Sequence, residues 1–388
     1  MFQFSSRINI PPSPTLHINS LALEKKRRGE RVYNVSAGEP LMQTPEVIVA
    51  AARDAIGSGK THYSPVQGIP ELVTALQGYF FSRYGATYTP DEICVTNGGK
   101  FGLYGLCQVL LEPGDEALII APYWVSYDAM TRLAGGVPII IPTSLQNKWK
   151  VTKEQLAAVK TPRTKILFFN NASNPTGVLY TKEELRDILS WAYENNVFVI
   201  SDEVYSGLVY DGNVFASAAL FREYAQGVAV VESASKNFAM TGWRLGSVSA
   251  PAPIIHAFKV LQGQSTSNTS TISQWAAVAA YTHHETLMPI IQKEMQDKRD
   301  AFVREWTLSG FPEVDMPGAG LYVFFPLLSS TGSFLDDVTW CAHVLDRCGV
   351  AAVPGSAFGA PGFVRFSFGG DIPETTAALH ALKDHGVL

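Results

Sequence analysis

Lys236 is the residue whose type and setting most directly predict covalent chemistry. It ends the run Ser233-Ala234-Ser235-Lys236, which follows the apolar stretch Val228–Val231 and precedes a segment that ends at Arg244. Lysine side chains are ordinarily exposed, so a lysine beside a buried strand stands out. A buried lysine loses its charge readily and becomes a nucleophile able to form a Schiff base with a carbonyl compound.

Three further places carry groups suited to binding a flat, phosphorylated ring. Asn97-Gly98-Gly99-Lys100 follows a predicted strand and opens a helix, where backbone N–H groups can approach a phosphate, although a tight strand–helix turn explains the glycines equally well. Asp202 ends the apolar run Val197–Ile200, either as a binding carboxylate or as an ordinary strand cap. Trp124 follows another predicted strand and could stack on a ring.

Taken together, these residues meet the requirements of pyridoxal 5′-phosphate. That cofactor needs a Schiff-base lysine, a cradle for its phosphate and an acidic partner for its pyridine nitrogen. Lys236 and Asp202 supply the first and the last of these. The candidate phosphate donors are Gly99, Ser233, Ser235 and Arg244.

The segments that must position these side chains alternate short apolar runs with longer helical patterns. Several runs are apolar throughout, which is typical of strands buried on both faces of a mainly parallel sheet. A helix over Lys182–Asn196 is predicted by an apolar stripe and by the capping box of Thr181 and Glu184. The alternation predicts an α/β domain, in which ligands bind outside the carboxyl ends of the strands. The predicted strands are Ile93–Thr96, Ala117–Ala121, Val137–Ile141, Lys165–Asn170, Val197–Asp202, Val228–Ser233 and Leu245–Ala250.

The pattern predicts a large cofactor-binding domain over residues 45–281 and a smaller α+β domain over residues 282–388. A long charged helical pattern over residues 285–308 marks the change. We expect residues 1–44 to pack with the smaller domain, so that both termini contribute to it. The other elements expected there are Leu321–Phe325, a helix around Asp336–Cys348, Phe363–Phe368 and a last helix.

Composition argues against several classes of protein. The 388 residues carry 30 Lys+Arg against 35 Asp+Glu, a net charge of −5, without the basic excess of a nucleic-acid binder. Four separated cysteines without a CxxC pair argue against a disulfide framework or a zinc site. His283-His284 has no evident companion ligand, so no metal is expected. Without a signal-peptide pattern or a run of ~18 apolar residues, we expect a cytoplasmic protein that does not span a membrane.

The motifs, taken in order, resemble the class I aminotransferases of fold type I and look closest to bacterial aspartate aminotransferases. The resemblance runs from about Ser13 to about Phe368. It implies a large domain with a mainly parallel sheet flanked by helices, and a smaller α+β domain formed by both termini. The motifs are Ser36–Pro40, Tyr63 with Gly68, Asn97–Lys100, Pro122–Trp124, Asn174–Gly177, Ser201–Tyr205, Ser233–Gly246 and Arg365.

The resemblance implies a role for each matching cofactor residue. Lys236 binds pyridoxal 5′-phosphate as a Schiff base and then moves the substrate's α-proton, while Asp202 pairs with the pyridine nitrogen. Tyr205 and Asn174 bond the ring's phenolic oxygen, and Trp124 stacks on the ring. The residues implied around the phosphate are Gly98, Gly99, Lys100, Ser233, Ser235 and Arg244, with Tyr63 from the neighbouring subunit of a homodimer.

The resemblance also implies a substrate pocket. Arg365 binds the α-carboxylate as a two-pronged donor, assisted by Asn174 and the Gly38 backbone, and Trp124 is also expected to contact the substrate. Lys100 pairs with a distal carboxylate, Thr15 of the segment Ser13-Pro14-Thr15 also serves the substrate side chain, and the partner's segment 264–267 completes that pocket. The alternative for Lys100 is a place beside the phosphate or in solvent.

The chain departs from the usual family pattern at Leu41-Met42, Ala172 and Leu321, which bears on the choice of substrate rather than on the class of reaction. The predicted function is transfer of an amino group between an L-amino acid, best aspartate or glutamate, and a 2-oxo acid. The alternatives are an aromatic amino acid or prephenate aminotransferase and, further off, a lyase or synthase on the same fold. A cofactor-sensing DNA regulator is disfavoured because residues 1–44 lack a helix-turn-helix pattern.

Overall fold

The computed structural model describes residues 4–328, 332 and 335–387. Its larger part is built on a seven-stranded sheet with the order β2-β8-β7-β6-β5-β3-β4. β8 runs antiparallel to β2 and β7, and the pairs from β7 to β4 are parallel, which confirms the predicted mainly parallel sheet. The strands are β2 (Ile93–Thr96), β3 (Glu116–Ala121), β4 (Val137–Pro142), β5 (Thr164–Asn170), β6 (Phe198–Asp202), β7 (Val228–Ser233) and β8 (Gly246–Ser249).

Helices cover both faces of this sheet, so its central strands are buried on both sides. On one face Ile119, Ile166 and Ile200 form a core cluster with residues of α4, α5 and α9. On the other, Leu118 and Leu167 form a cluster with residues of α2, α3, α7 and α10. The helices of the larger part are α2 (Glu46–Gly57), α3 (Pro70–Tyr84), α4 (Gly99–Leu110), α5 (Ser126–Leu133), α6 (Lys153–Val159), α7 (Lys182–Glu194), α8 (Ala234–Asn237), α9 (Ala252–Gly263) and α10 (Thr271–Thr282).

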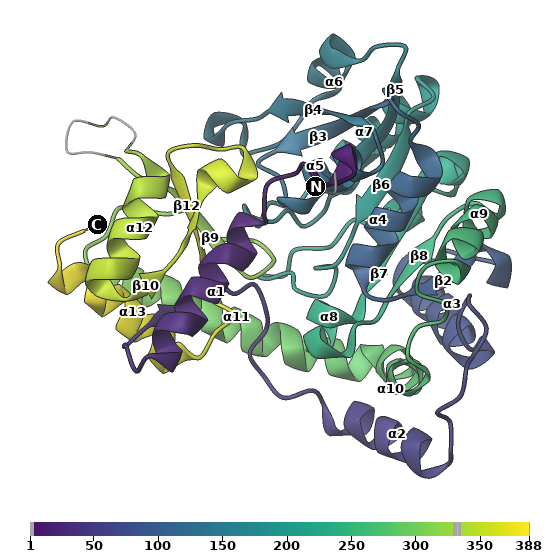
Figure 1. Ribbon diagram of the computed structural model, residues 1–388, viewed down its shortest axis with the longest axis horizontal. Coiled ribbons are helices and arrows are strands. Elements are labelled where there is room, and N and C mark those ends of the chain that lie inside the picture. Colours follow the sequence, from purple (N-terminus) through teal and green to yellow (C-terminus); the bar gives the residue numbers. More distant parts are fainter. Residues whose placement is uncertain (1–3, 329–331, 333–334, 388) are drawn as a thin grey trace.

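The smaller part combines a three-stranded antiparallel sheet, in the order β11-β12-β9, with three helices. A second core, which includes Trp306, Phe325, Val344 and Phe366, holds these elements together. Figure 1 shows α11 running from this part toward α8 and α10, both of which it contacts. The elements are β9 (Tyr322–Pro326), β10 (Val350–Ala351), β11 (Val353–Pro354), β12 (Phe363–Ser367), α11 (His284–Leu308), α12 (Asp337–Cys348) and α13 (Ile372–Asp384).

The N-terminal segment packs against the smaller part. β1 (Tyr33–Asn34) pairs in parallel with β10, and α1 (Pro14–Arg27) contacts β10 and β11. In Figure 1, α1 is drawn in purple near α12 and α13. The division into residues 1–44, 45–281 and 282–388 stays a prediction, and residues 1–3, 329–331, 333–334 and 388 of those ranges lie outside the described residues.

Among the described residues, no helix is long and apolar enough to cross a membrane. Nor do those residues bring three or more His, Cys, Asp or Glu side chains together in a group able to hold a metal ion.

Candidate active site

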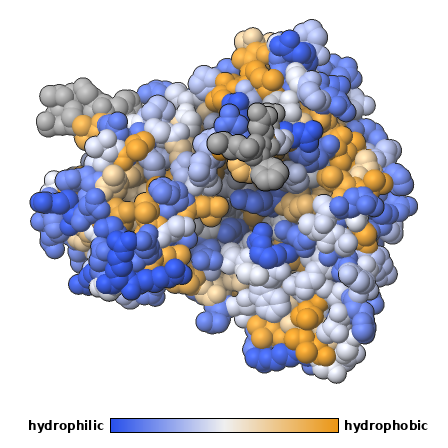
Figure 2. Space-filling model, in the orientation of Figure 1, coloured by the Kyte–Doolittle hydropathy of each residue, from blue (hydrophilic) through white to orange (hydrophobic). Residues whose placement is uncertain are grey.

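A cavity of about 410 Å³ lies at the carboxyl ends of β5, β6 and β7, which contribute Asn170, Asp202 and Ser233 to its wall. Figure 2 shows this face of the molecule hollowed between its two parts. Most of the residues predicted for the site line the cavity. They are Thr15, Gly38, Gly99, Lys100, Trp124, Asn174, Asp202, Tyr205, Ser233, Ser235, Lys236, Arg244 and Arg365.

Lys236 lies on the short helix α8, directly beyond β7. Its Nζ donates a 2.5 Å hydrogen bond to the carbonyl oxygen of Gly38, on the loop after β1. Burial, helped by the charges of Arg244 and Arg365 and opposed by that of Glu39, lowers the pKa of the Lys236 amine to about 8. The amine therefore deprotonates more readily than an exposed lysine, as a nucleophile or a base requires.

Asp202, the last residue of β6, is buried at the floor of the cavity. Its Oδ2 accepts a 2.7 Å hydrogen bond from the Tyr127 hydroxyl, and its Oδ1 accepts one of 3.4 Å from the Val204 amide. Burial raises the pKa of Asp202 to about 6 against the opposing effect of these two hydrogen bonds. Tyr127 was not among the predicted residues; its one sequence signal is its place one turn after Trp124.

The side chains predicted to hold a phosphate meet where α4 begins. Gly98 has φ of 79°, and a Cβ at this position would lie 2.6 Å from Arg244 Nη2, so only glycine lets the guanidinium approach the turn. Ser233 Oγ accepts a 3.2 Å hydrogen bond from the Ser235 amide. A helix N-terminus with an arginine and two hydroxyls is suited to an anion. Gly98 itself does not line the cavity.

Arg365 reaches the cavity from β12 and is 3% exposed. Its Nη1 donates to Asn174 Oδ1 (3.0 Å) and its Nη2 to the Ser36 carbonyl oxygen (2.7 Å). Its Nε has no hydrogen-bond partner among the described residues, and none of the ion pairs there includes Arg365. A buried guanidinium is costly without an anion, so this arrangement indicates an anionic ligand.

Tyr205 and Tyr322 both line the cavity, and their hydroxyl groups are hydrogen-bonded, with the two oxygens 2.8 Å apart. A Cβ on Gly38 would collide with the Tyr322 hydroxyl, so this glycine lets the loop after β1 pass close to β9. Sequence reasoning missed Tyr322 as a site residue. It stands 117 positions from Tyr205, and no local spacing could have joined them.

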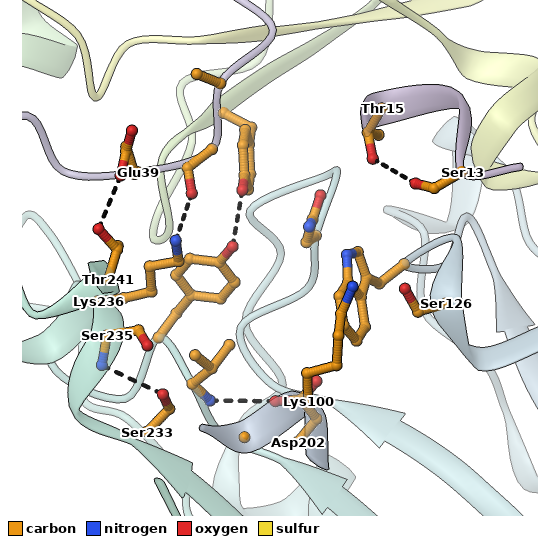
Figure 3. A pocket seen from close by; sticks show the side chains of 18 of the residues that line it. Ser13, Thr15, Glu39, Lys100, Ser126, Asp202, Ser233, Ser235, Lys236 and Thr241 are labelled. Atoms are coloured by element: carbon orange, nitrogen blue, oxygen red, sulfur yellow. Dashed lines mark hydrogen bonds between the residues drawn. The ribbon is translucent and has the colours of Figure 1, made fainter. Parts of the chain in front are cut away.

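Lys100 and Trp124 form the opposite wall, with Lys100 Nζ 4.8 Å from the centroid of the Trp124 ring. Ser13 Oγ and Thr15 Oγ1 lie 3.0 Å apart at the start of α1. Figure 3 shows Lys100, Ser126, Ser13 and Thr15 on one side of the cavity and Lys236, Ser235 and Ser233 on the other. Cavity residues missed by sequence reasoning also include Leu16, Asn19, Glu39, Leu103, Ser126, Asn170 and Thr241.

Comparison with known proteins decides the family. Residues 30–382 match the model of the family described as "Aminotransferase class I and II". The chain belongs to this family. The predicted resemblance and the predicted class of enzyme, an aminotransferase, are both confirmed.

Relatives of this aminotransferase cover nearly all of its length. The probable aspartate/prephenate aminotransferase of Thermus aquaticus is 39% identical over 363 residues, 93% of each chain. The aspartate aminotransferase of Bacillus sp. (strain YM-2) is 38% identical over 364 residues, 92% of each chain. Among solved structures, the Thermus thermophilus aspartate aminotransferase with maleate superposes with a TM-score of 0.93 at 37% identity, covering 100% of both chains.

Two predicted contributions to the aminotransferase site lie away from the cavity of this chain. Tyr63 is 93% exposed and does not line it. Ser265, in the segment 264–267, is likewise exposed and absent from its wall. Both were predicted to act in the partner subunit, and that role stays a prediction.

Proposed function

We propose that this aminotransferase uses pyridoxal 5′-phosphate, held by Lys236, to move an amino group between aspartate or glutamate and a 2-oxo acid. The observation that carries the proposal is that one cavity is lined both by an amine of lowered pKa, Lys236, and by a buried, incompletely paired guanidinium, Arg365. The first suits a carbonyl partner and the second a carboxylate.

The residues of the cavity are suited to this cofactor. The start of α4 with Ser233, Ser235 and Arg244 would hold its phosphate, and Asp202 would face its ring nitrogen. Trp124, Asn174 and Tyr205 would contact the ring. When bound, pyridoxal 5′-phosphate supplies an aldehyde that reacts with amines and a protonated ring that withdraws electrons.

The chain's own groups then have distinct tasks. When the Lys236 amine is not bonded to the cofactor, its Nζ would remove the α-proton of the substrate and deliver it to another atom. The lowered pKa of Lys236 favours this role as a base. A protonated ring nitrogen beside Asp202 would favour the ionised carboxylate and so offset the effect of burial, which raises the pKa of Asp202. Tyr127 would still donate its hydrogen bond to Oδ2. Arg365, which lines the cavity, would bind the substrate's α-carboxylate.

Lys100 supports a dicarboxylic substrate. It faces the cavity from the side opposite Lys236, with Ser13 and Thr15 as neutral donors nearby. A prephenate or aromatic substrate is the second candidate, because Leu16 and Leu103 give the same cavity apolar wall. Relatives at 39% identity are named aspartate/prephenate aminotransferases.

We further propose a cytoplasmic homodimer with shared sites. Tyr63 is almost fully exposed, and the nearby helix α2 exposes Val47 and Ile56, so this surface has apolar area for a partner to cover. The four cysteines are free and buried, in keeping with a reducing compartment.

A spectroscopic screen tests the reaction. The purified protein, loaded with pyridoxal 5′-phosphate, is mixed with aspartate, glutamate, phenylalanine or alanine, and conversion of the cofactor to its amine form is followed by absorbance. We expect the fastest conversion with the two dicarboxylic amino acids. Release of ammonia or pyruvate without an oxo-acid acceptor would instead indicate a lyase.

A further inference from the structure

A buried polar cluster lies beside the strand ends, outside the wall of the cavity. At its centre is Glu232, which is 0% exposed and next to last in β7. Because successive strand residues point to opposite faces, Ser233 lines the cavity while Glu232 points away from it. The other members are Tyr79, Arg83, Glu203, Ser206 and Asn237, and none of them lines the cavity.

Each carboxylate oxygen of Glu232 has two partners. Oε1 accepts hydrogen bonds from Asn237 Nδ2 (2.6 Å) and from the Ser233 amide (3.2 Å). Oε2 lies 3.0 Å from Ser206 Oγ and 3.3 Å from the Tyr79 hydroxyl. A carboxylate at this depth, satisfied on both oxygens, holds its neighbours in one arrangement.

Asn237 connects this carboxylate to the candidate site. It directly follows Lys236 and ends α8, a helix of four residues. A helix that short cannot be held by its own hydrogen bonds, so its place depends on side-chain anchors. Asn237 Oδ1 accepts a 2.9 Å hydrogen bond from the amide of Gly207, two residues after Tyr205, and its Nδ2 also lies 3.0 Å from Ser206 Oγ.

We propose that Glu232 and Asn237 form a positioning pair that fixes the turn carrying Lys236 against the turn carrying Tyr205 and the end of β7 carrying Ser233. The pair lines no part of the cavity and acts through these three residues. Without the pair, α8 loses the hydrogen bonds that connect it to two neighbouring segments. The affinity for the cofactor then falls, and the Lys236 side chain is no longer held in one orientation. The inference rests on the proposed function, which supplies the cofactor.

Residue 232 needs a side chain of the shape of glutamate, but not its negative charge, to make these hydrogen bonds. Oε1 faces two N–H groups that can only donate, whereas Oε2 faces two hydroxyls that can donate or accept. A glutamine at 232 can therefore place its carbonyl oxygen toward Asn237 and its amide toward the hydroxyls. Burial raises the pKa of Glu232 to about 8 against the opposing charge of Arg83, so a neutral side chain is tolerable here.

Four variants of the full chain test the pair. Asn237→Ala and Glu232→Ala break it, Glu232→Gln retains it, and Tyr79→Phe is a matched control that removes a hydroxyl from the same carboxylate without touching α8. The readouts are the Kd for pyridoxal 5′-phosphate, from absorbance of cofactor-depleted protein, and kcat and KM measured separately. Urea unfolding of each variant records its stability.

We expect both alanine variants to raise the cofactor Kd about tenfold, the effect of losing a buried hydrogen bond, and to lower kcat more than they change KM. Glu232→Gln should recover most of that loss, and Tyr79→Phe should stay within about threefold of the parent chain. If Glu232→Ala does not fold, the cofactor Kd and kcat of Asn237→Ala are compared with those of Glu232→Gln, and this comparison decides whether the pair positions the lysine.

Two results would overturn the inference while leaving the proposed function intact. One is an Asn237→Ala variant whose cofactor Kd and kcat equal those of the parent chain. The other is an equal loss in all four variants, Tyr79→Phe included, because that describes a merely structural cluster. A parent chain that binds no pyridoxal 5′-phosphate would instead overturn the proposed function, and this inference with it.

Discussion

The Tyr127 hydroxyl donates a 2.7 Å hydrogen bond to Asp202, the buried carboxylate at the floor of the cavity. Tyr127 is itself held by a stacked contact with Phe168, with ring centroids 4.6 Å apart. Tyr127 does not line the cavity, but it orients the Asp202 carboxylate that we propose faces the cofactor's ring.

Removing the charge of Asp202 should therefore cost more than removing its orienting partner. We expect Asp202→Asn to lower kcat at least ~10²-fold, on the scale of a positioned catalytic group. Tyr127→Phe loses one hydrogen bond and should lower kcat about tenfold or less. Steady-state kinetics with aspartate as donor measures both. Near-normal turnover by Asp202→Asn would mean that another acid serves the ring.

Lys236 is expected to be the residue that binds the cofactor covalently. Borohydride reduction of the loaded protein, followed by peptide mass spectrometry, should place the adduct on Lys236. Lys236→Ala should lose both the adduct and turnover. Lys100 lines the same cavity and provides the internal comparison, since an adduct there would contradict the assignment.

The raised pKa of Asp202 predicts how the stability of the cofactor-free chain depends on pH. Because the folded chain holds this proton to about pH 6 and the unfolded chain only to about pH 4, its contribution to stability is present below pH 4 and is lost as the pH rises through 6. The loss is at most about 3 kcal/mol. Urea unfolding at several pH values should show it in the parent chain and not in Asp202→Asn. A stability difference between the two that does not vary with pH would contradict the prediction.

Tyr63 is expected to serve the partner's site. Mixing inactive Tyr63 and Lys236 variants under conditions of subunit exchange should restore part of the activity, because one of the two hybrid sites then has both residues. The measurement is turnover before and after exchange, with exchange itself verified by mass spectrometry. No gain after verified exchange would show that each chain builds its own site.

Lys100 is expected to select substrates with a distal carboxylate. Breaking an ion pair in a partly desolvated pocket costs about 2–5 kcal/mol, so Lys100→Ala should lower kcat/KM for aspartate ~30-fold or more. Alanine, which has no distal carboxylate, should be affected much less. An equal fall for both substrates would place Lys100 with the phosphate instead.

The fold was largely predictable because its signals are local. The helix predicted over Lys182–Asn196 is observed as Lys182–Glu194, and its capping box forms, with the Glu184 amide donating to Thr181 Oγ1 at 3.2 Å and the Thr181 amide to Glu184 Oε2 at 2.7 Å. The strand predicted over Val228–Ser233 is observed as β7, and every one of its residues is buried.

The residues behind the site were not predictable in the same way. Tyr322 meets Tyr205 from 117 positions away, and Asn237 meets Gly207 from 30. Such contacts depend on how the segments pack, which no local spacing encodes. In the sequence, Glu232 is a polar residue within an otherwise apolar strand. Its burial is explained only by the hydrogen bonds that each of its carboxylate oxygens accepts in the folded chain, such as those from Asn237 and Ser206.

The cavity is closed by segments that lie before and after the seven-stranded sheet in sequence, since Lys236 contacts the Gly38 carbonyl oxygen and Arg365 contacts that of Ser36. Ribosomes make a chain from its N-terminus, and domains fold in that order as they emerge. In a nascent chain, the segments of the seven-stranded sheet and Lys236 therefore emerge while β12, with Arg365, is still unmade. The cavity wall is complete only once β12 has been made, so a message truncated before codon 365 would yield a chain that has Lys236 but lacks Arg365.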